Sequence, residues 1–153
     1  MIIIEAEATF ARAQSRPQGL AAREGLRFER KVFSELRKAL PDKGFLVERN
    51  PWFRYRKPDG TEHFCSPDIL VTDREDGYIA IVEVKLSWVP NVLDKVCNLY
   101  CPVVQRALDV PTKGLVIAKN SGPGAPQANS RFMFALMSAN PFLVWRGDGP
   151  IVL

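Results

Sequence analysis

The feature that most constrains the fold is a pair of apolar runs with charged residues near their ends. The first run is Ser66-Pro67-Asp68-Ile69-Leu70-Val71-Thr72, and the second is Tyr78-Ile79-Ala80-Ile81-Val82-Glu83-Val84-Lys85. The residues between them, 73–77, are rich in Asp and end in Gly, which predicts the turn of a β-hairpin. Charged groups in β-branched sequence are costly to bury unless they are paired or bind a metal. The hairpin therefore predicts an ionic site within a sheet.

The expected register of this hairpin brings two carboxylates together. If Asp73 pairs with Tyr78, Asp68 lies opposite Glu83, and opposed Cβ atoms on one face are about 4.5–5.5 Å apart. Carboxylates at that separation repel or share a proton unless a cation lies between them. Side chains alternate along a strand, so Glu83 and Lys85 share a face. The pattern favours a divalent-cation site beside a lysine. The alternative is a charged strand end with a solvated Lys85.

Residues 22–40 are predicted to form an amphipathic helix that carries a third carboxylate. Its apolar stripe consists of Ala22, Gly25, Leu26, Val32, Phe33, Leu36 and Leu40. Glu29 falls within this stripe, whereas the basic residues of the helix mostly lie off it. A glutamate on a buried stripe needs a partner, and a metal site on the neighbouring sheet would supply one.

Three short motifs therefore follow one another along the chain. Pro67-Asp68 and Glu83-Val84-Lys85 resemble the two signatures of the PD-(D/E)XK nuclease superfamily, and Gly25-Leu26-Arg27-Phe28-Glu29 is similar to a motif of its first helix. The resemblance covers roughly residues 20–120. It implies an α/β fold with a mixed central β-sheet flanked by helices. The restriction-endonuclease-like core would have the order helix-strand-strand-strand-helix-strand.

The resemblance also implies a role for each matching residue. Asp68, Glu83, the backbone carbonyl of Val84 and Glu29 would bind Mg²⁺ or Mn²⁺, and Lys85 would orient or help deprotonate the attacking water. Mg²⁺ prefers oxygen ligands, and a bound ion lowers the pKa of water and offsets charge on the phosphate. The implied activity is that of a Mg²⁺-dependent deoxyribonuclease, a hydrolase of DNA phosphodiester bonds that leaves 5′-phosphate products.

Basic residues gather outside this acidic centre. The formal net charge is +4, and the basic residues are concentrated in the first helix and in residues 49–57. Alternation in the strand predicted there places Trp52, Arg54 and Arg56 on one face, which suits phosphates and stacked bases. An ordinary two-sided strand is the alternative. Including three residues of the second helix, the expected DNA contacts are Arg49, Arg54, Arg56, Lys57, Lys95, Tyr100 and Gln105.

The remaining sequence sets the domain organisation. Residues 1–20 are expected to be an N-terminal extension with a helical tendency at 5–14, followed by a single nuclease-like domain over 21–153. Further strands are predicted at 45–48, 52–57, 61–65 and 114–118. A helix over 88–108 is expected to kink or break at Pro102. Beyond these, we predict a loop at 121–129, a short helix at 131–138 and a strand at 142–146.

Composition narrows the class of protein. No apolar run is long enough to span a membrane, and the first residues do not resemble a secretory signal. Three cysteines without a framework spacing fit a reducing compartment, so we expect a cytoplasmic protein. The short chain has no evident sequence-reading domain, which favours structure-directed or non-specific cleavage. The expected partners are DNA and either a second copy of the chain or a larger nucleoprotein complex.

Two alternatives to a nuclease remain at this point. A catalytically silent nucleic-acid-binding or assembly protein would keep the same fold, although the intact Asp68, Glu83 and Lys85 argue against it. A metal-stabilised interaction module would bind zinc or an iron–sulfur cluster through soft ligands. Its candidate ligands are His63, Cys65, Cys97 and Cys101. Free cysteines, however, are usually small buried hydrophobes.

Overall fold

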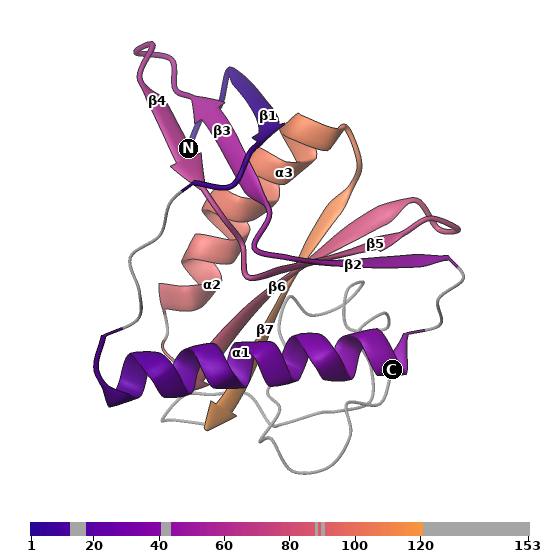
Figure 1. The fold of residues 1–153 in the computed structure, drawn as a ribbon. Helices are drawn as coiled ribbons and strands as arrows, with labels where there is room; N and C mark the ends of the chain where they lie inside the picture. The colour runs from indigo at the N-terminus through magenta and orange to yellow at the C-terminus, as the bar shows by residue number, and fades with distance from the viewer. Residues whose placement is uncertain (13–17, 41–43, 88, 90, 121–153) are drawn as a thin grey trace.

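The described part of the chain contains two β-sheets and two helical regions. The computed structural model describes residues 1–12, 18–40, 44–87, 89 and 91–120. In chain order (Figure 1) its elements are β1 (Glu5–Thr9), α1 (Leu20–Ala39), β2 (Phe45–Arg49), β3 (Trp52–Arg56), β4 (Glu62–Cys65), β5 (Ile69–Asp73), β6 (Tyr78–Ser87), α2 (Asn91–Lys95), the π-helix η1 (Val96–Tyr100), α3 (Cys101–Leu108) and β7 (Thr112–Asn120). The loop, helix and strand predicted over residues 121–146 lie outside the described residues.

A four-stranded mixed sheet forms the centre of the fold. Its strand order is β2-β5-β6-β7, in which β2 and β6 are both antiparallel to β5 and β7 is parallel to β6. The predicted hairpin register is confirmed, because Asp73 pairs with Tyr78 and Ile69 with Val82. The predicted mixed sheet and its order of helices and strands are observed, with β3 and β4 inserted between β2 and β5.

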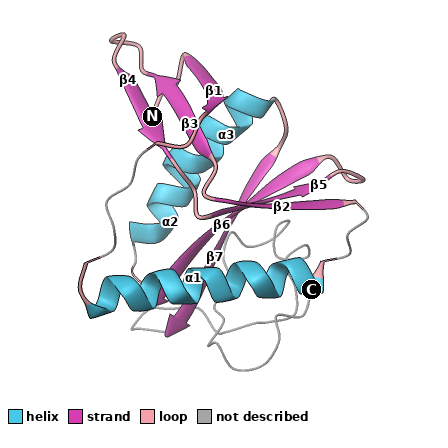
Figure 2. Cartoon of the chain, viewed as in Figure 1, coloured by secondary structure: helices cyan, strands magenta, loops and turns pink. Residues whose placement is uncertain are grey.

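Helices cover both faces of this central sheet (Figure 2). α1 packs on one face, where its residues Phe28, Val32 and Leu36 join a core with Ile69, Val71, Val82, Val84 and Leu115. The stretch α2-η1-α3 packs on the other face, where Val96, Val103 and Val104 join Leu70, Ile81 and Val116. Since Val82 and Val84 face α1, the intervening Glu83 points to the face that η1 covers.

The stripe predicted for α1 differs from the structure in two places. Val32, Leu36 and Leu40 are buried as expected, but Ala22 is exposed, and Phe28, which was not assigned to the stripe, is buried. The helix begins at Leu20, and its first residues extend beyond the sheet that would cover them. Which residues of α1 are buried therefore depends on where the sheet ends as well as on the helical period.

The second helical region is interrupted where Pro102 predicts a break. The π-helix η1 ends immediately before α3, whose first turn contains Pro102. The N–H of Cys101 donates to the carbonyl of Val96, and this wide turn accommodates the irregularity. On β7 below it, a Cβ added at Gly114 would overlap the side chain of Val96. Glycine at this position lets η1 approach the sheet closely.

An outer antiparallel sheet with the strand order β1-β3-β4 extends beside the central one. β3 and β4 correspond to the strands predicted at 52–57 and 61–65, and they pair as a hairpin. The helical tendency predicted near the N-terminus is wrong for residues 5–9, because β1 pairs with β3 over its whole length. Pairing with β3 here overrides local propensity. No helix in the described part of the chain is both long and apolar enough to cross a membrane.

Candidate active site

Asp68 lies where the chain returns from the outer sheet to begin β5. The N–H of Asn50 donates to the carbonyl oxygen of Asp68 at 2.8 Å, and the hydroxyl of Ser66 donates to the carbonyl of Pro51 at 2.8 Å. Asn50 has a φ of 50°, a left-handed conformation that asparagine tolerates better than most residues. These contacts tie together the two crossings between the sheets and fix the backbone of Asp68.

The carboxylate of Asp68 continues the pairing of β5 with β6 beyond the last backbone pair. Ile69 and Val82 are that last pair, and one residue farther Asp68 lies opposite Glu83. The N–H of Val84 donates to Oδ2 of Asp68 at 2.7 Å. β6 continues past the end of β5, and there the carboxylate of Asp68 accepts from the backbone N–H of Val84. The same bond orients the carboxylate beside Glu83.

Glu83 is the most buried charged residue of the described structure, with only 2% of its surface exposed. Its Oε1 lies 3.2 Å from Nζ of Lys85 and 3.7 Å from Nζ of Lys95. Its Oε2 is buried and has no hydrogen-bond partner among the described residues. An unsatisfied buried acceptor costs about 1–3 kcal/mol, and more when it is charged. A cation at this oxygen would remove that penalty.

Electrostatics at Asp68 also favour an additional positive charge. Burial, followed by the negative charges of Glu83 and Glu29, raises the pKa of Asp68 to about 8, although the Val84 N–H and Lys85 act in the opposite direction. Without a cation, Asp68 therefore retains its proton near neutral pH. A divalent ion favours the ionised form of nearby carboxylates, so the pair Asp68 and Glu83 fits such an ion chemically.

Glu29 approaches from α1, but its side chain is bonded to Arg49. Nε of Arg49 donates to Oε1 of Glu29 at 3.2 Å, and the side chains of Arg49 and Glu29 are 25% and 15% exposed. The partner of this glutamate is thus an arginine of β2. In the ranges that the structure describes, no three His, Cys, Asp or Glu side chains are grouped to hold a metal. The ligand role of Glu29 and the phosphate role of Arg49 stay predictions that require this ion pair to open.

Two of the three residues predicted from the second helical region lie at the site. Lys95 contacts Glu83 and lies 5.0 Å from the centre of the Tyr100 ring. Tyr100 is 3% exposed, and burial together with the charges of Glu83 and Asp68 raises the pKa of its hydroxyl. Gln105 is elsewhere: its Oε1 accepts from the N–H and the hydroxyl of Thr112, at the other end of the pairing between β6 and β7.

The arginines of β3 share one face as predicted, but that face is not basic. Arg54 contacts Glu7 and Glu62, and Arg56 contacts Glu5 and Glu62. The two cations thus face three carboxylates. Contact of Arg54, Arg56 and the nearby Lys57 with DNA stays a prediction, and the carboxylates would compete with the phosphates.

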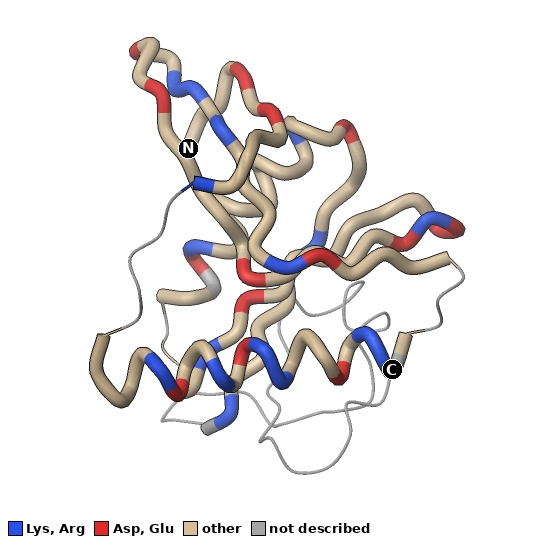
Figure 3. Tube along the Cα trace, in the orientation of Figure 1, with Lys and Arg blue, Asp and Glu red and all other residues tan. Residues whose placement is uncertain are grey.

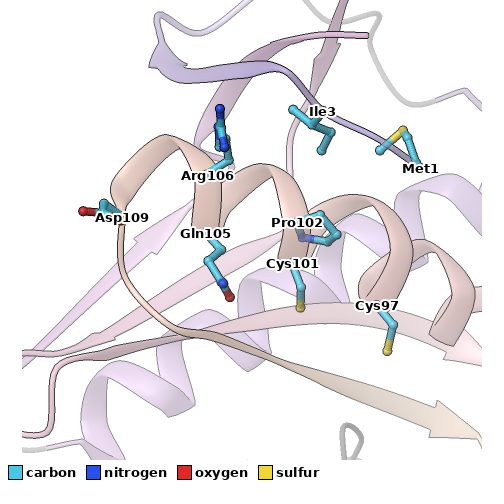
Figure 4. Close-up of a pocket in the computed structure, with 8 residues that line it drawn as sticks. All are labelled: Met1, Ile3, Cys97, Cys101, Pro102, Gln105, Arg106 and Asp109. Carbon is cyan, nitrogen blue, oxygen red and sulfur yellow. The ribbon is translucent and has the colours of Figure 1, made fainter. Parts of the chain in front are cut away.

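The four soft ligands do not come together as a metal site. His63 stacks on Tyr55 with ring centres 5.3 Å apart, and burial of Cys65 raises its pKa to about 12. Cys97 and Cys101 lie side by side along the helix and line a separate pocket of about 570 Å³ (Figure 4). All four residues are described, and no group of three His, Cys, Asp or Glu is arranged to hold a metal in the described part. The described structure therefore does not bring these four residues together as the zinc or iron–sulfur alternative requires.

Sequence reasoning missed the residues that hold Asp68 in position. Asn50 and Ser66 each precede a proline, and Asn-Pro and Ser-Pro dipeptides favour turns. That signal marks two turns without showing that they are bonded to each other. The contact of Lys95 with Glu83 was also absent from the sequence argument, because it depends on how closely η1 approaches β6.

Comparisons with known proteins give a fold-level likeness only. No protein-family model matches the sequence, and no curated protein matches it. One solved structure that matches is described as "Structure of a Type III CRISPR defence DNA nuclease activated by cyclic oligoadenylate", with 18% identity and a TM-score of 0.48. The match covers 84% of this chain but only 18% of the other. The structural similarity is therefore to part of a DNA nuclease, and it transfers no residue roles.

Proposed function

We propose that this chain is a divalent-metal-dependent nuclease that hydrolyses DNA phosphodiester bonds. The observation that carries the proposal is the pair of Asp68 and Glu83 beside Lys85. One carboxylate oxygen of Glu83 is buried with no donor among the described residues, and the pKa of Asp68 is raised to about 8. Burying such a pair costs stability, and functional sites are where such a cost is retained.

Asp68 and Glu83 would hold Mg²⁺ or Mn²⁺, together with the backbone carbonyl of Val84. When bound, the ion would supply a water of lowered pKa and positive charge beside the phosphate. The N–H of Val84 keeps Asp68 oriented toward Glu83. Lys85 is 35% exposed, so its ammonium group reaches both Glu83 and an incoming phosphate or water. Water would attack phosphorus, and the bond from phosphorus to the leaving oxygen would break as that oxygen gains a proton.

A second candidate function is DNA binding or assembly without turnover. One observation favours it: Lys85 and Lys95 both contact Oε1 of Glu83, so two cations already offset much of its charge. In such a protein the lysines would permanently replace a metal ion. The unpartnered Oε2 is the feature that this alternative leaves unexplained.

Cleavage assays with matched variants separate the two functions. Labelled duplex, single-stranded and branched DNA and single-stranded RNA are incubated with Mg²⁺, with Mn²⁺ or with a chelator. Asp68→Asn and Glu83→Gln, purified in parallel, keep the shapes of the side chains but remove their charges. We expect metal-dependent DNA cleavage by the wild type and none by either variant. Equal cleavage by the variants, or no cleavage of any substrate, would overturn the nuclease assignment.

A further inference from the structure

The solvent face of α1 carries basic side chains along most of its length. The helix contains six basic and three acidic residues. At about 100° per residue, the basic residues fall within an arc of about 120°. This arc lies opposite the buried residues of the helix, and Figure 3 shows basic positions recurring along α1. The members of this α1 stripe, all exposed, are Arg23, Arg27, Arg30, Lys31, Arg37 and Lys38.

Most of the α1 stripe is not neutralised by nearby acids. Lys38 has one contact at 4.0 Å with Glu35, and its side chain is 72% exposed. Within the ranges that the structure describes, no carboxylate forms an ion pair with Arg23, Arg27 or Arg30. The arginines of β3, in contrast, contact three glutamates. Arg23, Arg27 and Arg30 therefore project from the α1 stripe without paired acids among the described residues.

The C-terminal half of the stripe borders a shallow pocket of about 390 Å³. Its lining includes Phe33, Ser34, Arg37 and Lys38. The guanidinium of Arg37 lies 5.6 Å from the centre of the Phe33 ring, which holds it beside the pocket. A hydroxyl and two cations around one hollow form a suitable seat for a phosphate group.

We propose that the α1 stripe binds the phosphate backbone of duplex DNA, as a surface separate from the Asp68–Glu83 site. From Arg23 to Lys38 the stripe extends about 22 Å, at about 1.5 Å per residue. Duplex DNA carries one charge per roughly 1.7 Å of its axis, so a band of cations this long can lie beside several phosphates. α1 packs on one face of the central sheet, and Glu83 points to the opposite face. The stripe and Glu83 are therefore on opposite sides of the sheet. The stripe would hold a stretch of DNA away from the point of cleavage.

An anionic membrane is a poorer match to the same charges. Helices that lie on membranes insert an apolar face between lipids. The apolar residues of α1, among them Phe28, Val32 and Leu36, are instead buried against the sheet. The inference concerns binding alone and rests on the proposed function only in taking duplex DNA as the ligand.

Two double variants with equal loss of charge provide the test. Arg27→Gln with Arg30→Gln alters the α1 stripe, and Arg54→Gln with Arg56→Gln removes the same charge from β3. Affinity for a labelled duplex longer than the stripe is measured by fluorescence anisotropy across a salt titration, in a chelator to prevent cleavage. We expect the α1 variant to reduce the salt slope by about two units, roughly 0.9 per lost phosphate contact. The β3 variant should reduce it by less than about one unit.

The outcomes distinguish this inference from the proposed function. An α1 variant with the wild-type slope and affinity overturns the stripe, whether or not the protein cleaves DNA. If the α1 variant binds DNA as the wild type does but no longer binds phosphatidylserine vesicles, the stripe binds a lipid surface. That result would also overturn the inference that it binds DNA. If the α1 variant loses DNA binding but the wild type cleaves nothing, the stripe stands and the nuclease assignment fails. Far-ultraviolet circular dichroism and melting of both variants establish that these exposed substitutions leave the fold intact.

Discussion

Two strands of this molecule carry charged residues at the same spacing, with opposite consequences. On β6, Glu83 and Lys85 are two residues apart, and so are Arg54 and Arg56 on β3. Glu83 is 2% exposed, and one of its oxygens has no hydrogen-bond partner in the part of the chain that the structure describes. The side chains of Arg54 and Arg56 are 35% and 43% exposed and are paired with glutamates.

The difference lies in burial and charge balance rather than in spacing. The outer sheet surrounds its cations with carboxylates in contact with water, where ion pairs contribute little to stability. The central sheet buries Glu83 beside Asp68, and the lysines reach only one of its oxygens. The proposed ligand site therefore lies at β6, where buried charge is left unbalanced, and not at β3. Figure 3 shows acidic and basic positions meeting where β2, β5 and β6 converge.

The largest expected effect is on the cleavage rate, and it distinguishes Lys85 on β6 from the arginines of β3. Lys85→Ala should lower the single-turnover cleavage rate about 10²–10⁴-fold, the usual contribution of a group that assists proton transfer. Its affinity for DNA should be nearly unchanged, because one cation among many contributes little to phosphate binding. The rate is measured with saturating enzyme and Mg²⁺.

The matched control is Arg56→Ala, which removes one cation at the corresponding position of the β3 pair. It should cleave within about twofold of the wild type. If both variants cleave at the wild-type rate, Lys85 has no role in the chemistry. If both are equally slow, the comparison between the two strands fails.

The second prediction concerns stability without metal. The pKa of Asp68 is about 8 in the folded protein and 3.8 in its unperturbed state. The folded state therefore holds a proton that the unfolded state releases above about pH 4. The resulting stability is fully present below pH 4 and is lost as the pH rises toward 8. The metal-free wild type should melt at a lower temperature at pH 8 than at pH 5. The Asp68→Asn variant should show a smaller difference in melting temperature between the two pH values.

At pH 8 the Asp68→Asn variant should itself melt higher than the metal-free wild type. An increase of about 2–4 °C corresponds to about 1 kcal/mol in a chain of this size. Asparagine keeps an oxygen that can accept from Val84, so the hydrogen bond survives. Mn²⁺ should raise the melting temperature of the wild type by mass action and that of the variant much less. A variant that melts lower without metal and gains as much from Mn²⁺ would show that Asp68 is not a ligand.

Much of the fold was predictable because its strongest patterns are local. The hairpin of β5 and β6 follows from two β-branched runs around an Asp- and Gly-rich turn, and its register from the turn itself. The break before α3 follows from the missing N–H of Pro102. β1 was not predictable in this way, because its sequence Glu-Ala-Glu-Ala-Thr becomes a strand only by pairing with β3.

The site was predictable in its residue types and less so in its contacts. Alternation along one strand places Glu83 and Lys85 on one face without knowledge of other elements. The bond between Glu29 and Arg49 joins residues 20 positions apart on α1 and β2, and no sequence period encodes it. The same limit applies to β3, where the acids that balance Arg54 and Arg56 come from β1 and β4. A sequence shows which residues are charged, but which of those charges are neutralised depends on the ion pairs that form in the tertiary structure.

The smallest expected effect tests that balance directly. Glu62 contacts both Arg54 and Arg56, so Glu62→Gln should release part of the charge of both arginines. Affinity for duplex DNA should then rise modestly, and the salt slope should increase by up to about one unit. The free energy of unfolding should change by less than about 1 kcal/mol, because these ion pairs are exposed. Salt titrations by fluorescence anisotropy and urea unfolding measure the two quantities.

Glu75→Gln, an exposed substitution in the turn between β5 and β6, removes the same charge without touching an arginine of β3. Any increase in DNA affinity that comes from net charge alone would appear equally in this control. A larger increase in Glu62→Gln would show that β3 has a phosphate-binding face that its own glutamates mask. Equal affinities would mean that β3 does not contact DNA even when its arginines are released, and the predicted roles of Arg54 and Arg56 would then be wrong. A marked loss of stability would instead show that the outer sheet needs these ion pairs to fold, and that its balanced charges are structural.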